Sequence, residues 1–211
     1  NIEGLGEKII DLAEQCGDQE TLRTERERMA TDFCARKDIE KALDMYQQMF
    51  CDGNCSVEVR LKLIDLHLER GDRKIGLQHI RALLSLGEAE KIRDETVLQR
   101  LHGQVCELNP GDSRSNRWLV DYHLRVGNRT AAVEVLQGLV SYLEKEGEFR
   151  QAILVLRQLT LLDPDGMDHI WRLAAALLKL GKIQEHIQEL RKAAQLALHK
   201  NQPPQAERAL G

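Results

Sequence analysis

The 211-residue sequence has no apolar run of the length that a membrane-spanning helix needs, about 18 or more residues. Its longest purely apolar run covers only residues 173–178. Proline is scarce, with four residues, and clusters of β-branched residues are few, so the composition favours helices over a sheet. The 30 basic and 34 acidic residues nearly balance. This balance argues against a dedicated nucleic-acid surface and against strong binding to an anionic membrane.

Cysteine is also sparse: the chain has five, an odd number that cannot all pair within it. A secreted disulfide scaffold is denser in cysteine and usually has an even number. We therefore expect reduced, mostly buried thiols in a cytoplasmic protein. Cys51 and Cys55, with Cys34 and His67 elsewhere in the sequence, lack the second matched pair of a structural zinc site. The sequence predicts no metal and no cofactor.

What the sequence does contain is helical hairpins, and the clearest one runs from Leu136 to Pro164. Apolar residues recur at helical spacing on either side of Gly147, which stands where a helix can end in a left-handed conformation. Pro164 cannot continue a helix and closes the second stripe. Ala152 is the one small residue in that second stripe, so we expect the two helices to approach closely there. The two stripes are Leu136, Leu139, Val140 and Leu143, then Phe149, Ala152, Ile153, Leu156 and Leu159.

The same pattern returns elsewhere in the chain at a spacing of 34 residues, over residues 26–49, 60–83 and 170–193. A large–small–large stripe, followed by glycine, an aromatic residue, alanine and proline, resembles the tetratricopeptide repeat (TPR), whose period is 34 residues. Lys37 departs from this pattern where glycine is expected, and Gly76 and His186 replace the usual small alanine. The resemblance implies an all-α solenoid of helical hairpins; a compact helical bundle is the alternative.

The pattern predicts about twelve helices in one TPR-like domain over residues 1–211, with a break in repeat phase around 87–112. Because the chain begins with Asn1, we expect it to be a segment of a longer protein. The predicted helices cover 1–16, 19–36, 39–50, 57–70, a segment starting at 73, 94–108, a segment from 112 or 113 to 126, 130–145, 148–162, 167–180, 183–198, and a short segment after 204.

No motif in the sequence predicts catalysis. There is no glycine-rich phosphate loop, and no serine or cysteine nucleophile has a histidine and an acid in a motif around it. Asp163, Asp165 and Asp168 resemble the start of a calcium loop, but Ala174 stands where the bidentate glutamate is needed. We expect a turn instead, in which Asp165 or Asp168 caps the next helix.

A partner surface is the remaining candidate site. In TPR proteins the first helix of each repeat lines the concave groove, so the resemblance implies that matching positions contact a partner. Arginines near Asp121 could bind carboxylates, although an exposed charged face is the simpler interpretation. The asparagine and lysine pattern by which chaperone-binding TPR proteins hold a terminal carboxylate is not met. The candidate residues are Arg114, Arg117, Asp121, Leu124, Arg125, Trp171, Leu178, Leu61, Asp65 and Leu68.

The sequence thus predicts a protein-interaction scaffold that binds a protein or peptide, with carboxylates on the bound segment. It predicts no catalytic residues, no nucleic-acid partner and no membrane insertion. One alternative is a regulatory or assembly domain of a larger protein whose activity lies outside this segment. A second alternative is an enzyme built on a helical-repeat scaffold.

Overall fold

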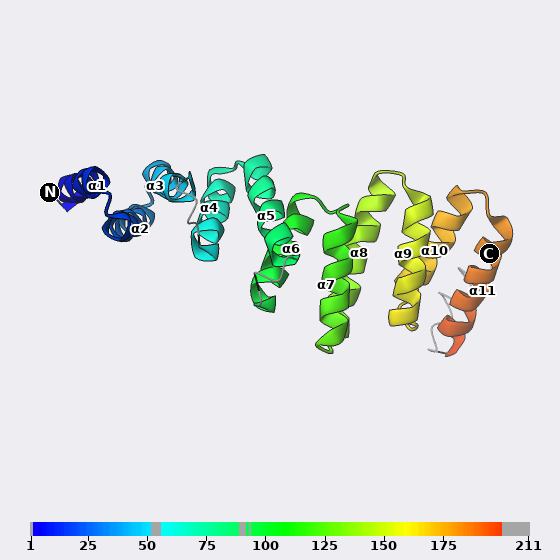
Figure 1. Ribbon diagram of the computed structural model, residues 1–211. Coiled ribbons are helices and arrows are strands. Elements are labelled where there is room, and N and C mark those ends of the chain that lie inside the picture. Colours follow the sequence, from blue (N-terminus) through cyan, green and yellow to red (C-terminus); the bar gives the residue numbers. More distant parts are fainter. Residues whose placement is uncertain (1, 52–55, 89–91, 93, 200–211) are drawn as a thin grey trace. The chain divides into compact units, whose positions relative to one another are not determined.

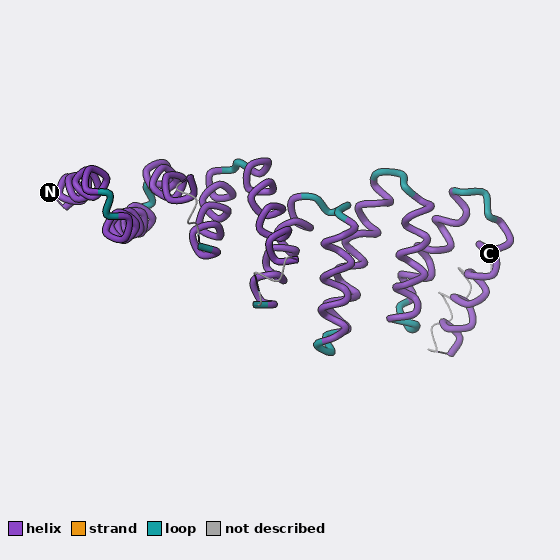
Figure 2. The backbone as a smooth tube through the Cα atoms, in the orientation of Figure 1, coloured by secondary structure: helices purple, strands orange, loops and turns teal. Residues whose placement is uncertain are grey.

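The computed structural model describes residues 2–51, 56–88, 92 and 94–199. These residues form eleven helices and no strand (Figures 1 and 2). The predicted all-helical array of hairpins is confirmed, while the twelfth helix predicted after residue 204 lies outside the described residues. The helices are α1 Ile2–Cys16, α2 Gln19–Ala35, α3 Ile39–Cys51, α4 Val57–Arg70, α5 Arg73–Glu88, α6 Glu95–Leu108, α7 Ser113–Arg125, α8 Arg129–Lys145, α9 Phe149–Leu162, α10 Met167–Lys179 and α11 Ile183–His199.

Contacts between Cα atoms divide the chain into two compact units, which we call unit 1 (residues 1–101) and unit 2 (residues 102–211). The boundary falls inside α6. In unit 1 each helix from α1 to α5 packs on the next, and in unit 2 the same holds from α7 to α11. That residues 1–211 behave as a single domain stays a prediction.

Short-range signals set the helix ends. Five helices begin at a side-chain cap in which an oxygen accepts from a backbone N–H three residues on, at 3.0–3.3 Å. The caps are Asp18, Asp38, Ser56, Asp112 and Asn128. Six turns have a residue at positive φ just after or near the helix end. Five of these residues are glycine, and the sixth is Lys37, with φ of 60°.

One predicted cap is wrong. α10 begins after Gly166, whose position carries no side-chain cap, and Asp168 lies inside the first turn. Asp163, directly after α9, accepts a hydrogen bond from His169 Nε2 of α10 at 3.1 Å, and this bond spans the turn. His169 is buried on α10, so this bond ties the end of α9 to the next helix.

Each unit has its own apolar core. Ala152, which is fully buried, lies in the unit 2 core with Leu136 and Leu156, as its place in the stripe predicts. Two departures from the repeat also have a packing reason. A Cβ added to Gly76 would lie only 2.6 Å from Leu68 Cδ2, so the Leu68 side chain of α4 occupies the space that an alanine methyl group would need. His186 Nδ1 lies 2.8 Å from the Ala174 carbonyl oxygen, and this contact links α11 to α10.

Ion pairs also connect helices that are two apart in the array. Arg172 donates to Glu144 at 2.8 Å and so joins α10 to α8. Exposed pairs of this kind each contribute little to stability, so the cores supply most of it. The other pairs are Glu3–Lys41 between α1 and α3, Asp65–Arg100 between α4 and α6, and Arg157–Glu185 between α9 and α11.

Candidate partner-binding groove

The groove nearest to the predicted arginines begins with α7, whose first turn is fixed by two side chains. Asp112 caps the helix by accepting from the Ser115 N–H at 3.0 Å. The Asn116 amide nitrogen donates to the carbonyl oxygens of Pro110 and Asp112, at 2.8 and 2.9 Å. Both amide hydrogens of Asn116 are therefore used inside the protein, and this residue orients α7 rather than serving a partner.

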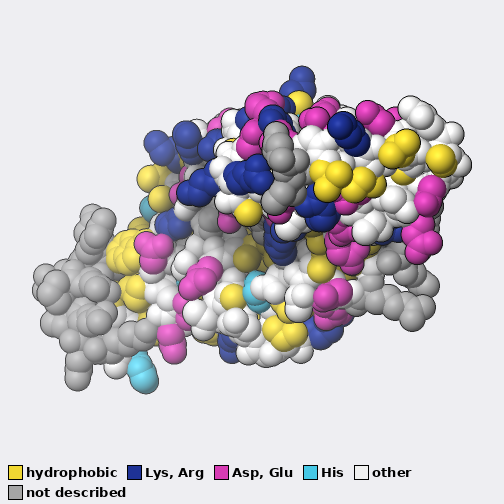
Figure 3. Space-filling model, turned by 90° about the vertical axis from the view of Figure 1, so that its left-hand side faces the viewer, with side chains coloured by type: hydrophobic (Ala, Val, Ile, Leu, Met, Phe, Trp, Pro, Cys, Tyr) yellow, Lys and Arg dark blue, Asp and Glu magenta, His cyan; other side chains and the backbone are white. Residues whose placement is uncertain are grey.

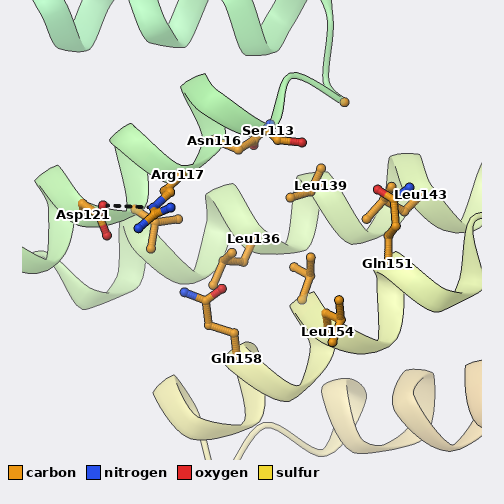
Figure 4. Close-up of a pocket in the computed structure, with 13 residues that line it drawn as sticks. Ser113, Asn116, Arg117, Asp121, Leu136, Leu139, Leu143, Gln151, Leu154 and Gln158 are labelled. Carbon is orange, nitrogen blue, oxygen red and sulfur yellow. Dashed lines mark ion pairs between the residues drawn. The ribbon is translucent and has the colours of Figure 1, made fainter.

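A cavity of about 510 Å³ lies between α7 and α9, with α8 as its floor (Figure 4). We call it the unit 2 groove. The apolar base of the groove belongs to the unit 2 core, because Val120 of α7 and Leu136 of α8 are only 1% and 3% exposed. The lining residues are Gly111, Ser113, Asn116, Arg117, Val120 and Asp121 from the α7 side, Leu136, Leu139 and Leu143 from α8, and Gln151, Leu154, Val155 and Gln158 from α9.

The charged rim of the groove is open to solvent. Arg117 Nε lies 3.8 Å from Asp121 Oδ2, and the two side chains are 86% and 69% exposed. An exposed pair at this distance on one helix is worth a few tenths of a kcal/mol. A carboxylate from another molecule could therefore replace Asp121 at the Arg117 guanidinium at little cost.

The α9 side of the groove adds an apolar and a polar contact. Leu154 is 67% exposed although it is a large apolar residue. Gln158 extends from α9 toward Arg117 and Asp121, and its amide has no hydrogen-bond partner among the described residues (Figure 4). An amide that offers both a donor and an acceptor suits the backbone of an extended peptide.

The other predicted residues of unit 2 do not line this groove. Arg125 lies over the Tyr122 ring, with 5.9 Å from Cζ to the ring centre. Trp171 is partly buried and packs against a small core that includes Ile170. Arg114 is exposed, and Leu124 and Leu178 are 39% and 50% exposed, outside the lining of the groove.

Leu61, Asp65 and Leu68 lie on α4, in unit 1. Asp65 is already ion-paired with Arg100 of α6, and Leu68 packs beside Gly76 of α5. The structure therefore brings together Arg117 and Asp121 of the predicted set, and it gives Asp65 and Leu68 of α4 contacts of their own.

Buried titratable groups next to α7 are held neutral. His102 stacks on Trp118 at 4.5 Å between ring centres, and its Nδ1 lies 3.1 Å from Ser115 Oγ. Burial lowers the pKa of His102 to about 4. Burial likewise raises the pKa of the Cys106 thiol to about 11, so this cysteine is not activated as a thiolate. The contacts of His102 with Trp118 and Ser115 stabilise the packing of α6 on α7.

Across the described residues, no group of three or more His, Cys, Asp or Glu side chains is arranged to hold a metal ion. The predicted cysteine pair lies partly outside this range, because Cys55 is among residues 52–55. Within the same described ranges, no helix is both long and apolar enough to cross a membrane.

Sequence reasoning missed the α9 side of the groove. Leu154 lies off the buried stripe of α9, and this is the signal that could have marked it as an exposed apolar contact. Gln158 has no such signal, because its role depends on how α9 faces α7.

No family model matches the chain, and no curated protein matches it. Among solved structures it is similar to a point mutant of MamA, at 17% identity over 82% of this chain and 91% of that chain, with a TM-score of 0.46. It is also similar to YrrB, described as a TPR protein with an unusual peptide-binding site (14% identity, 90% and 96% coverage, TM-score 0.43). A third is the TPR2AB domain of yeast Sti1 in a pHSP90 complex (11%, 90% and 96%, TM-score 0.35). With TM-scores below 0.5, the description of the fold rests on the helices of this chain.

Proposed function

We propose that this chain is a protein-interaction module and that the unit 2 groove binds an extended segment of a partner protein. The observation that carries the proposal is the combination of an open cavity of about 510 Å³, an exposed Leu154 and an exposed Arg117 above an apolar floor. Arginine is enriched among the energetic contacts of interfaces, and binding sites are typically concave and mostly apolar with a few polar groups. The proposal gives the chain no catalytic role, and the cytoplasm is its predicted location.

The bound segment would carry a carboxylate and a bulky apolar side chain. The carboxylate would accept from the Arg117 guanidinium, which forms paired hydrogen bonds with carboxylates. The apolar side chain would cover Leu154, and the Gln158 amide would bond the backbone of the segment. Arg125 and Trp171, which the resemblance also suggested, would act only if the partner extends beyond the groove.

The test uses two fluorescein-labelled ten-residue peptides in which leucine alternates with either glutamate or lysine. Fluorescence anisotropy measures binding of each peptide to the full chain. We expect the acidic peptide to bind, and Arg117→Glu and Leu154→Ser each to weaken it at least about tenfold, which corresponds to about 1.4 kcal/mol.

The matched control is Arg150→Glu, which reverses an exposed arginine on α9 that does not line the groove. It should leave the affinity for the acidic peptide nearly unchanged. Circular dichroism first confirms that all variants keep the helicity of the wild type. If Arg117→Glu and Arg150→Glu behaved alike, the acidic peptide would be responding to overall charge, and the groove would not be its site.

A further inference from the structure

Unit 1 contains a second groove, which is built in the same way from different side chains. A cavity of about 610 Å³ lies between α1 and α3, and α2 supplies Met29 and Phe33 to its floor. We call it the unit 1 groove. It lies between two alternate helices with the intervening helix behind them, as the unit 2 groove does between α7 and α9.

The floor of the unit 1 groove is apolar and adaptable. Ile10, Met29 and Phe33 are 8%, 3% and 4% exposed, and Met45 of α3 packs partly buried against the same core. Methionine side chains are flexible and polarizable, so they adjust to apolar groups of different shape. This floor can therefore accept a bulky apolar side chain from outside.

The rim of the groove is acidic, with six carboxylates and one lysine among its lining residues. Three of the carboxylates are already neutralised by ion pairs inside unit 1. Glu3 pairs with Lys41 and Arg36, Glu14 accepts from Arg26 at 2.6 Å, and Glu40 accepts from Arg70 at 3.1 Å.

The other three carboxylates are Glu7, Asp11 and Asp44, and none of them has an ion pair with a described residue. Glu7 and Asp11 are four residues apart and share one face of α1, while Asp44 lies on α3 across the groove. All three are exposed. Like charges at this helical spacing repel each other, so a cation that enters the groove is favoured.

On the face shown in Figure 3, acidic, basic and hydrophobic side chains are interspersed, and one sign of charge does not cover the surface. A bare metal ion does not fit, because no described set of three His, Cys, Asp or Glu side chains is close enough to hold one. Lysine and arginine side chains have long stems that can reach carboxylates on two helices.

We propose that the unit 1 groove binds a basic amphipathic segment of a partner protein. Lysine or arginine side chains of that segment would pair with Glu7, Asp11 and Asp44. A bulky apolar side chain between them would lie on Met29, Phe33 and Met45. The two grooves of the chain thus bind segments of opposite charge.

The test uses three labelled twelve-residue peptides and fluorescence anisotropy with the full chain. The first has lysine and leucine in a helical amphipathic pattern, the second replaces lysine with glutamate, and the third replaces leucine with serine. We expect only the lysine–leucine peptide to bind well, with affinity falling as salt rises. Glu7→Lys with Asp11→Lys should weaken it at least about tenfold, and Met45→Gln should weaken it about threefold or more.

The matched control is Glu20→Lys with Glu27→Lys, which makes the same change in net charge at exposed positions on α2 outside the groove. It should bind the lysine–leucine peptide nearly as the wild type does. Equal affinities of the two double variants would overturn the proposal, and so would equal binding of the lysine–serine and lysine–leucine peptides. Sedimentation velocity of the wild type tests whether a second copy of this chain occupies the unit 1 groove. If the wild type self-associates and the variant with Glu7→Lys and Asp11→Lys does not, the occupant of the groove is a second copy of the chain, and the proposal of a partner segment is overturned.

Discussion

Lys37 adopts a backbone conformation that costs a residue with a Cβ. Its φ is 60°, while the five comparable turns have glycine with φ between 70° and 93°. A residue with a Cβ in the left-handed region destabilises the folded state by roughly 1–2 kcal/mol. Glycine avoids this strain, but it loses more conformational entropy on folding, which offsets about 0.5–1 kcal/mol of the gain. Lys37→Gly should therefore stabilise unit 1 by about 1 kcal/mol. The lysine side chain is exposed, so its loss removes no packing.

Urea denaturation followed by circular dichroism measures the effect, and Lys37→Ala is the control. Alanine removes the same charge but keeps the Cβ, so its midpoint should stay close to that of the wild type. The midpoint of Lys37→Gly should lie above both. A glycine variant no more stable than the alanine variant would refute the idea that the turn is strained at this residue.

Two further substitutions probe the core of unit 2. Ala152→Leu should overpack the fully buried contact between α8 and α9 and cost about 1–3 kcal/mol, whereas Ala175→Leu, at an exposed site on α10, should change the denaturation midpoint little. Because burial lowers the pKa of His102 from 6.5 to about 4, the unfolded state takes up the proton first as the pH falls. The wild type should therefore lose up to about 3 kcal/mol more than His102→Gln between pH 7 and pH 4, and equal losses would show that His102 does not titrate in this way.

The helices were predictable because their signals are local. A helix was predicted over residues 57–70, and the structure has α4 at Val57–Arg70, with Ser56 capping its start and Gly71 ending it in the left-handed conformation. The start of α10 at residue 167 was also predicted, but its predicted cap by Asp165 or Asp168 was wrong, because Gly166 stands at the cap position and no side chain caps the helix. Several aspartates lie near this turn, and the sequence alone does not show which of them bonds a backbone N–H and which bonds a side chain, such as Asp163 with His169.

The grooves depended on packing that the sequence does not state. The pattern placed Arg117 and Asp121 on one exposed face of α7, but it could not show that Leu154 and Gln158 of α9 face them. The unit 1 groove left a trace that was not used. Acidic residues at 3, 7, 11 and 14 recur at helical spacing on the first helix, and only the position of α3 turns this stripe into one side of a cavity.

The most direct test of the central claim, that the unit 2 groove holds a partner segment, is photo-crosslinking. The glutamate–leucine peptide would carry benzophenone in place of one leucine, and mass spectrometry of the digested full chain would locate the adducts. We expect adducts on α7 and α9 at lining residues such as Leu154 and Gln158, and their loss with Arg117→Glu. Adducts that gather instead at Leu161 or Leu178, outside the lining of this groove, and persist in Arg117→Glu would contradict the account.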